Sequence, residues 1–322
     1  MTTSKKLLVI AASALALATG VQAQVAIGGY AAASWTHTSG AAADRLDIDS
    51  ALLKFTGDSK PVSGVVSLFY APDSSFFSPT GVDADLHLLD VYANWDLGSG
   101  WSLTGGRFLS WLGYESFFAV NNPEITGANT VAGFIPGYEE GLRLTYTEKD
   151  WNAGFGVVDS AYNPVTALRG DGEWKSTYAI EAYFSYGGIK DLTVWFGLAY
   201  EPQPGDAKAK ATLDFWAQYQ VSKELYVAGE FTVEDNVAGA TADSETWLIL
   251  ANYAFDDKVS VAARVSGDTV NAAAAGDVKW TLAPTYTVSK NFSVRGEISY
   301  LVNSGKAAAD ATSVGVQGIF RF

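Results

Sequence analysis

TSVGVQGIFRF, residues 312–322, ends the chain and alternates between apolar and polar side chains. The apolar face consists of Val314, Val316, Phe320 and Phe322. Polar or small residues fill most of the other face, and only the pair at 318–319 breaks the pattern. Because a period of two residues is that of extended backbone, the segment is expected to be a β-strand with one apolar face.

The first 23 residues differ from the rest of the chain. Lys5 and Lys6 precede an apolar run that ends at Leu17, and small residues lead to Ala23. This order predicts a cleaved secretory signal peptide, residues 1–23, followed by a single β-barrel domain, residues 24–322. The apolar run is shorter than the roughly 18 residues that span a membrane. The absence of cysteine excludes disulfides and thiolate metal sites.

The composition favours an all-β transmembrane barrel. The chain is 48% hydrophobic and contains 10 Trp, 16 Tyr and 17 Phe, yet its apolar residues after position 23 are scattered at every second position. Glycine outnumbers proline by 32 to 9. Export, alternation and many aromatic residues together fit a bacterial outer-membrane barrel better than a soluble sandwich. The formal net charge of −14 argues against a nucleic-acid partner.

Sixteen segments with strand-like alternation follow one another along the chain: residues 25–36, 45–57, 62–71, 85–97, 101–109, 140–148, 151–159, 174–187, 191–200, 209–221, 224–234, 244–255, 258–267, 277–288, 291–302 and 312–322. Seven tight turns alternate with eight longer connections, which is typical of an antiparallel up-and-down outer-membrane barrel with short periplasmic turns. The alternation slips near residues 51–54, and Pro284 implies a bulge. Fourteen or eighteen strands therefore remain open alternatives.

Charged residues fall on the polar faces of the expected strands: Arg143, Glu181, Asp214, Glu230, Arg264, Lys279, Arg295 and Glu297. Burying all of them without water would carry large desolvation costs. They predict a wet lumen, which a barrel of about sixteen strands is wide enough to hold. Aromatic residues at or next to the short turns predict an interfacial belt: Trp101, Trp151, Tyr226, Phe255 and Phe292.

The third long connection, residues 110–139, contains six aromatic residues. About thirty residues without secondary structure are usually functional or disordered, and the aromatic content argues against disorder. We therefore expect this external loop to pack on the barrel wall.

Several short motifs lie in or near this connection: GRF at 106–108, LGYE at 112–115, an Asn-Pro pair at 122–123, the Pro136 segment, GLRLTY at 141–146 and GVVD at 156–159. Together they resemble the OmpL-like family of outer-membrane β-barrel porins. Asp159 departs from the Asn that is common in the family. The resemblance implies a pore in the Gram-negative outer membrane for passive diffusion of small hydrophilic solutes or ions. It also implies that the third loop folds inward and narrows the channel, as in general porins.

The resemblance carries expectations about partners as well. The C-terminal strand, with its terminal Phe322, is similar to the strands that the barrel assembly machinery reads. Outer-membrane lipid would surround the barrel, and a homo-oligomer such as a trimer is an open alternative to a monomer.

Eight charged residues are candidates for pore lining or for the constriction: Arg107, Glu115, Glu124, Glu139, Glu140, Arg143, Arg264 and Arg295. If the loop lies in the lumen, its carboxylates would face guanidinium groups of the wall, and the resulting transverse field would set ion preference. Alternatively, each arginine pairs with a nearby strand carboxylate, as Arg295 could with Glu297. Strict alternation from Trp101 would point Arg107 at lipid unless a bulge intervenes.

No residues support an enzyme, a metal site or a cofactor. The two histidines, His37 and His87, have no catalytic partner motif. Asp44, Asp47 and Asp49 lack the glycine and the closing glutamate of a calcium loop. Residues 154–156, GFG, lack the third glycine of a dinucleotide site. Two functions remain, a diffusion pore or a closed surface barrel acting as adhesin, receptor or structural outer-membrane protein, and external loops of about ten residues favour the pore.

Overall fold

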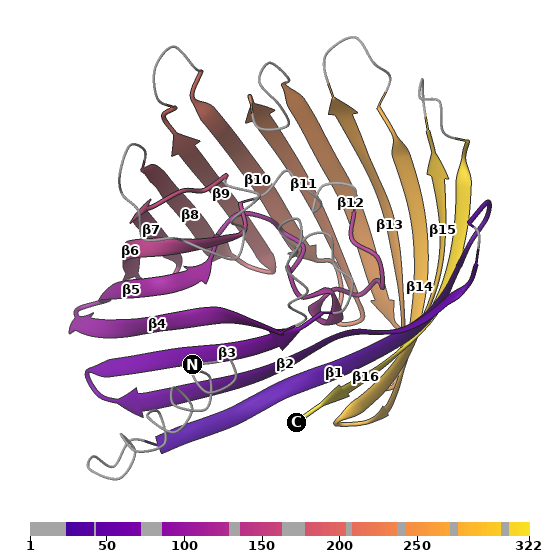
Figure 1. Ribbon diagram of the computed structural model, residues 1–322, viewed down its shortest axis with the longest axis horizontal. Helices are drawn as coiled ribbons and strands as arrows, with labels where there is room; N and C mark the ends of the chain where they lie inside the picture. Colours follow the sequence, from indigo (N-terminus) through magenta and orange to yellow (C-terminus); the bar gives the residue numbers. More distant parts are fainter. Residues whose placement is uncertain are drawn as a thin grey trace, which may run out of the picture.

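The computed structural model describes residues 24–41, 43–71, 86–128, 136–162, 178–203, 208–236, 243–270, 276–303 and 309–322 (Figure 1). The expected signal peptide, residues 1–23, lies outside these ranges and stays a prediction. Within them, no helix is both long and apolar enough to cross a membrane. The structure there is almost entirely β-sheet, with one short 3₁₀ helix, η1 (Ala119–Asn121).

Sixteen strands are present in the described residues: β1 (Gln24–Thr38), β2 (Arg45–Ser59), β3 (Val62–Tyr70), β4 (Leu86–Gly98), β5 (Trp101–Leu109), β6 (Tyr138–Thr147), β7 (Trp151–Val158), β8 (Ala179–Ile189), β9 (Leu192–Glu201), β10 (Lys210–Gln220), β11 (Leu225–Asp235), β12 (Ser244–Ala254), β13 (Val259–Val270), β14 (Val278–Ser289), β15 (Phe292–Val302) and β16 (Ala311–Arg321). Each corresponds to one expected segment, so the count predicted from alternation is confirmed.

The strands form one closed antiparallel barrel in which each strand pairs with its neighbours in sequence (Figure 1). β1 closes the barrel by pairing with β16, where Ala32 lies opposite Ile319. Two backbone hydrogen bonds of 3.1 Å between Gly29 and Phe322 extend this seam to the last residue. Closure removes the unpaired sheet edges that a membrane could not satisfy.

The strand pairing tests two local expectations, and the first of them is wrong. Pro284 causes no bulge, because the pairing of β14 with β13 and β15 keeps one register past it, and the shift on β14 lies between Thr287 and Ser289. On β2 the slip in alternation corresponds to a register shift opposite Ala32 and Ala33. It leaves Asp49 as the extra residue between Ile48 and Ser50.

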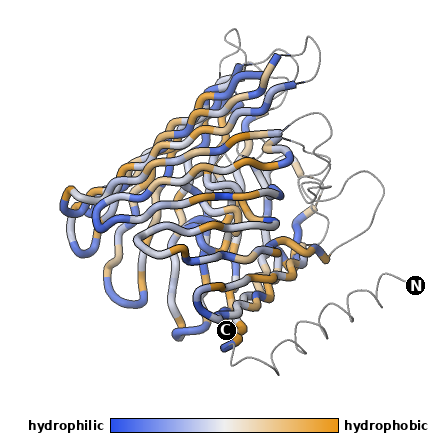
Figure 2. Tube along the Cα trace, turned by 90° about the vertical axis from the view of Figure 1, so that its left-hand side faces the viewer, coloured by the Kyte–Doolittle hydropathy of each residue, from blue (hydrophilic) through white to orange (hydrophobic). Residues whose placement is uncertain are grey.

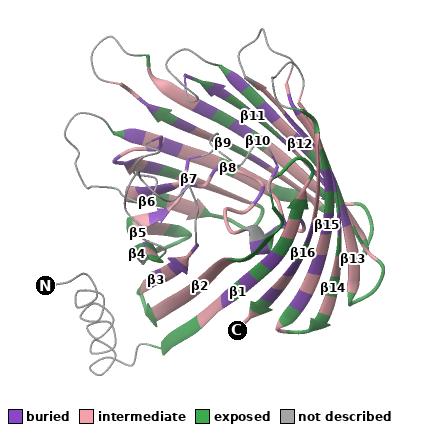
Figure 3. Ribbon diagram, turned by 45° about the vertical axis from the view of Figure 1, so that its right-hand side comes forward, coloured by how far each residue is buried: buried purple, intermediate pink, exposed green. Residues whose placement is uncertain are grey.

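The two faces of the wall differ as the alternation predicts. On β16, Val316 and Phe320 are 50% and 48% exposed, whereas Gln317 between them is 1% exposed and points inward. Figure 3 shows the same alternation of exposed and buried residues along neighbouring strands, and Figure 2 shows the matching alternation of hydropathy. Large apolar side chains cover the outside, as lipid contact requires.

The prediction of an aromatic belt beside the short turns is correct in part. Trp101, Phe255 and Phe292 are exposed on the outer surface beside the short turns. Tyr226 instead belongs to the inner face, where it packs against an interior cluster together with Tyr114. Its neighbour two residues on, Ala228, is buried in the same cluster, so Tyr226 does not contribute to a membrane-facing belt.

Three apolar clusters lie inside the barrel, between the wall and the connection from β5 to β6. One joins Tyr30, Leu89 and Ile319 of the wall to Val120 of the connection, and Ile319 is fully buried there. This explains why Ile319 interrupts the polar face of the last strand. Apolar residues on the inner face mark where that connection docks.

Candidate functional site

The connection between β5 and β6, residues 110–137, is called the third loop here, and it is described at 110–128 and 136–137. β6 begins at Tyr138, so Glu139 and Glu140 belong to the strand rather than to the expected loop. The described part crosses the barrel interior (Figure 1). Its backbone and side chains bind strands on two sides of the wall, which are described in turn.

Carboxylates of β8, β10 and β11 form the first side, called the acidic wall and defined by Glu181, Asp214 and Glu230. Asp214 accepts a hydrogen bond of 2.7 Å from the Gly113 backbone N–H, and Glu230 accepts one of 2.5 Å from that of Tyr114. Glu181 accepts from the Ser110 hydroxyl and, at 3.5 Å, from the Trp111 N–H. These carboxylates are almost fully buried, so each replaces lost hydration by holding loop N–H groups.

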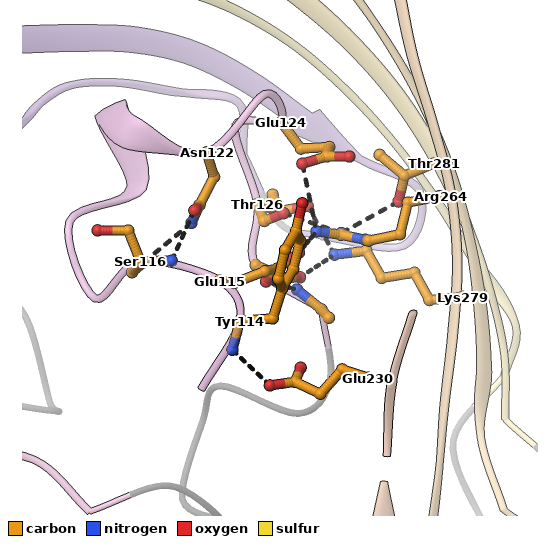
Figure 4. A network of polar contacts seen from close by, with 12 residues as sticks. Tyr114, Glu115, Ser116, Asn122, Glu124, Thr126, Glu230, Arg264, Lys279 and Thr281 are labelled. Atoms are coloured by element: carbon orange, nitrogen blue, oxygen red, sulfur yellow. Dashed lines mark hydrogen bonds and ion pairs between the residues drawn. The ribbon is translucent and has the colours of Figure 1, made fainter. Parts of the chain in front are cut away.

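Cations of β13, β14 and β15 form the second side, called the basic wall and defined by Arg264, Lys279 and Arg295. Lys279 donates to the Thr126 hydroxyl at 2.6 Å and to the Gly127 carbonyl at 3.0 Å. Arg295 donates to the Glu124 carbonyl at 2.7 Å. The basic wall therefore binds the acceptor groups of the loop (Figure 4).

Arg264 is the centre of this second contact. Its guanidinium forms an ion pair with Glu115 and lies 3.7 Å from the Glu124 carboxylate. It also donates to the Thr126 carbonyl at 2.9 Å and to the Thr281 hydroxyl at 3.3 Å. Two loop carboxylates thus converge on one buried wall arginine, as the close view shows (Figure 4).

Glu297 is the exception on the basic side. It accepts from the backbone N–H groups of Ile125 and Thr126 at 2.6 and 3.0 Å. The Thr126 hydroxyl donates to its other oxygen. Arg295 and Glu297 therefore both bind the loop. We expected either that loop carboxylates would face wall arginines or that Arg295 would pair with Glu297, and neither expectation described both contacts.

Arg143 holds the first residues of the loop. It donates to Glu139 at 2.9 Å, to Glu181 at 2.7 Å and to the Leu109 carbonyl at 2.7 Å. The Phe108 and Trp111 rings lie 3.8 and 4.0 Å from its guanidinium carbon. The side chain is enclosed by ion pairs and rings at the base of the loop.

Arg107 and Glu140 do not join this group. They lie opposite each other on β5 and β6, and the adjacent pair in the register is Phe108 and Glu139. The charged atoms of Arg107 and Glu140 are 3.9 Å apart. The Arg107 guanidinium also lies 5.7 Å from the centre of the Tyr138 ring. The structure thus brings six of the eight predicted residues to the loop contacts, and leaves Arg107 and Glu140 as a separate pair.

Burial dominates the charge state of Glu124 in the loop. Loss of hydration raises the pKa of its carboxyl from 4.5 to about 7, and Glu115 and Glu297 act in the same direction, while Arg264 opposes them. Because two carboxylates share Arg264, repulsion between them offsets part of the attraction to that arginine.

The groups rejected from the sequence have ordinary partners. His37 lies 2.6 Å from Asp44, and both are about half exposed at the rim. Asp47 pairs with Arg45 at 3.0 Å, and Asp49 accepts from Ser34 and Gln317 at 2.6 and 2.8 Å. Among the described residues, no group of three or more His, Cys, Asp or Glu could hold a metal ion.

The loop-binding role of the inner apolar residues was missed in the sequence. Leu248 and Leu250 of β12 are each 1% exposed and pack in the cluster that contains Ala128 of the loop. Trp195 of β9 belongs to the cluster that contains Leu112. All three stand on the inward face of strands whose outward face is also apolar. A strand that is apolar on both faces was therefore the signal that something packs inside.

The fold and this site together define a class of protein, the outer-membrane β-barrels with an inward third loop. A family model described as "Putative beta-barrel porin-2, OmpL-like" matches residues 28–322, and the chain belongs to this family. The resemblance stated from the motifs is therefore confirmed, and the protein is an outer-membrane porin. A search of curated proteins finds no match.

Solved outer-membrane proteins share the fold. OmpF of Salmonella typhi, in a complex with daunomycin, aligns with a TM-score of 0.71 and 12% identity over 93% of this chain and 98% of its own. The channel DcaP of Acinetobacter baumannii gives 0.69 and 12% over 93% and 97%. The anion-selective porin from Comamonas acidovorans gives 0.67 and 14% over 93% and 100%. At these identities the similarity is one of fold.

Proposed function

We propose that this porin is a passive channel for small hydrophilic solutes or ions, and that its third loop forms the narrowest part. The observation that carries the proposal is the attachment of the loop to opposite kinds of wall. N–H groups near Gly113 bind the acidic wall, while Glu115 and acceptors near Thr126 bind the basic wall. A segment fastened on both sides reduces the free cross-section that a barrel of this size would otherwise leave open.

The constriction comprises the loop and the charged groups that it contacts. Glu115, Glu124, Arg264 and Arg295 lie together on one side, and Glu139 and Arg143 lie at the base of the loop. The Arg107–Glu140 pair contributes charge from the neighbouring register. A charged, poorly screened constriction orients polar solutes and discriminates between ions. That these eight residues set selectivity is part of the proposal.

The test is deletion of residues 121–132, which removes every loop contact of Lys279 and Glu297 described above and the contacts of Arg264 with Glu124 and Thr126, but keeps Glu115. Single-channel conductance of the purified mature protein in planar bilayers should rise. A deletion of the same length in the second long connection, residues 72–83, is the matched control and should leave conductance nearly unchanged. Unchanged conductance in a folded 121–132 deletion would contradict the constriction, and a wild-type barrel that never conducts would favour the closed surface barrel.

We also propose that the porin assembles as a homotrimer in lipid and reaches the membrane through the barrel assembly machinery. An OmpT structure from Vibrio cholerae, 12% identical over 93% of this chain, is described as a trimer form. The outer face of β1 near the seam carries the small residues Ala31 and Ala33, which would allow close approach of a second wall. Native mass measurement in detergent checks the copy number, and truncation of Phe322 checks assembly.

A further inference from the structure

Three aromatic side chains stack across the inner face of the acidic side of the barrel. Tyr183 of β8, Trp195 of β9 and Trp216 of β10 form two parallel contacts. The Tyr183 and Trp195 ring centres are 6.0 Å apart with planes 12° apart, and the Trp195 and Trp216 centres are 5.8 Å apart with planes 7° apart. Trp195 and Trp216 lie directly opposite each other in the pairing of their strands. The rings therefore stand side by side, with their faces against one another.

The sheet makes room for these rings with glycine. A Cβ atom on Gly197 would lie 2.2 Å from the Trp195 ring, and one on Gly154 would lie 2.5 Å from the Tyr183 ring. Glycine weakens a strand, so its use inside β7 and β9 points to a required close approach. Gly154 is the first residue of the GFG segment that failed as a nucleotide motif.

The third loop extends the stack at both ends. Trp111 lies 4.7 Å from Tyr183, and Tyr114 lies 5.5 Å from Trp216, measured between ring centres. The Tyr114 hydroxyl donates to Gln218 at 2.8 Å. Along β8, Tyr183 is the next inward-facing residue after Glu181, and along β10, Trp216 is the next after Asp214. In both strands the ring lies nearer the short turn than the carboxylate that binds the loop. The stack therefore lies just beyond the loop on the side of the short turns.

The stack is partly open to the lumen. Trp195 is buried between its neighbours, whereas Tyr183, Trp216, Trp111 and Tyr114 each keep an exposed part. Because Tyr183 and Trp216 point inward, that part faces the barrel interior rather than lipid. The faces of the inner rings are used within the stack, so ring edges are what a passing solute meets.

We propose that these five rings form a binding strip for small solutes that carry an aromatic ring, at the inner exit of the constriction. This inference rests on the proposed channel function and names its preferred class of solute. Ring edges carry partial positive charge and ring faces partial negative charge, so a solute ring binds with its face toward the exposed edges. A saturated ring of the same size buries similar area but lacks this quadrupole.

The experiment compares two solutes with rings of six carbons, one with the quadrupole and one without it; the saturated ring is the more apolar of the two, so apolar burial alone would favour it. Phenylalanine and cyclohexylalanine, both zwitterionic, are added to wild-type channels in planar bilayers, and interruption of the ion current is measured against concentration. We expect phenylalanine to block at a concentration about three- to tenfold lower, the range that aromatic pairs add beyond burial of area. If the two solutes block half of the ion current at the same concentration, the proposal is overturned. This comparison uses the wild-type channel alone.

Variants then locate the site. Trp216→Leu should remove most of the difference between the two solutes, whereas Trp216→Phe, which keeps a ring, should retain most of it. A preference for phenylalanine that survives Trp216→Leu in a conducting channel would overturn the assignment to this strip. Ion current and swelling of glycine-loaded vesicles test the channel itself. If the wild type shows neither ion current nor swelling, the proposed channel function is wrong. If it shows both but has no preference between phenylalanine and cyclohexylalanine, only this inference is wrong.

Discussion

The acidic and basic walls hold the same loop by opposite means. On the acidic wall, wall carboxylates accept from neutral backbone N–H groups, as Asp214 does from Gly113. On the basic wall, the loop contributes its own charges, because Glu115 and Glu124 converge on Arg264. The first kind of contact uses only dipoles on the loop, whereas the second adds loop carboxylates at Arg264 to the neutral acceptors that Lys279 and Arg295 bind.

This difference has an energetic consequence. Removing Asp214 or Glu230 leaves a neutral backbone donor without its acceptor, and the cost of a buried unsatisfied N–H is modest. Removing the wall arginine leaves the buried Glu115 carboxylate without its cation, which costs more because an ionised group loses far more hydration energy. The basic wall should therefore be the attachment whose disruption by a single substitution lowers the free energy of unfolding more.

The largest effect is expected from Arg264→Ala. Breaking a buried ion pair from one side typically costs about 3–5 kcal/mol, and here the stranded charge would be Glu115, since Glu124, with its pKa raised to about 7, can take up a proton. The free energy of unfolding in urea, measured in lipid vesicles, should fall by that amount, and conductance should rise as the loop loosens. The variant Arg264→Ala with Glu115→Gln and Glu124→Gln is the control for stranded charge. If this triple variant is as unstable as the single one, lost packing rather than charge explains the effect.

A smaller effect is expected from Asp214→Ala on the acidic wall. The Gly113 N–H would lose its acceptor, at a cost of about 1–3 kcal/mol, and no charge would be stranded. Asp214→Asn keeps an acceptor oxygen and should cost less than the alanine variant. Urea unfolding of both variants beside Arg264→Ala measures the ranking directly. A loss for Asp214→Ala that exceeds the loss for Arg264→Ala would reverse the comparison of the two walls.

The charge of Glu124 makes the basic wall sensitive to pH. Its pKa is raised from 4.5 to about 7, so the folded protein keeps a proton that the unfolded chain releases as pH rises through this window. Stability should therefore fall between about pH 4.5 and pH 7 and then level off, with a slope of at most about 1.4 kcal/mol per pH unit from this group. Glu124→Gln should remove that part of the slope. An identical pH profile in the variant would assign the dependence to other groups.

The sequence predicted the barrel well because its signals are local. A period of two residues marks each strand and each inward charge, and both are visible within about ten residues. The contacts of the loop are different, since Glu115 and Arg264 are 149 residues apart and no local pattern pairs them. The alternation of β5 could not reveal the partner of Arg107 either, because that partner, Glu140, follows the whole third loop in the sequence. Inward apolar residues such as Ile319 and Trp195 were the available clue, because a wet lumen gives them no reason to be there.

The smallest effect is expected on ion preference, and it tests whether both walls act on the permeating ion. Lys279→Gln removes one positive charge from the basic wall, and Glu181→Gln removes one negative charge from the acidic wall, at a carboxylate that pairs with Arg143 at 2.7 Å. The first variant should favour cations and the second anions, measured as opposite shifts of the reversal potential in a salt gradient. Each should change the permeability ratio by less than about tenfold, since a unit charge 4 Å from an ion in water is worth about 1 kcal/mol. High salt should reduce both shifts, because screening shortens the reach of each charge. A shift from one variant only would mean that the ion passes close to that wall, whereas no shift from either would make these charges solely attachments of the loop.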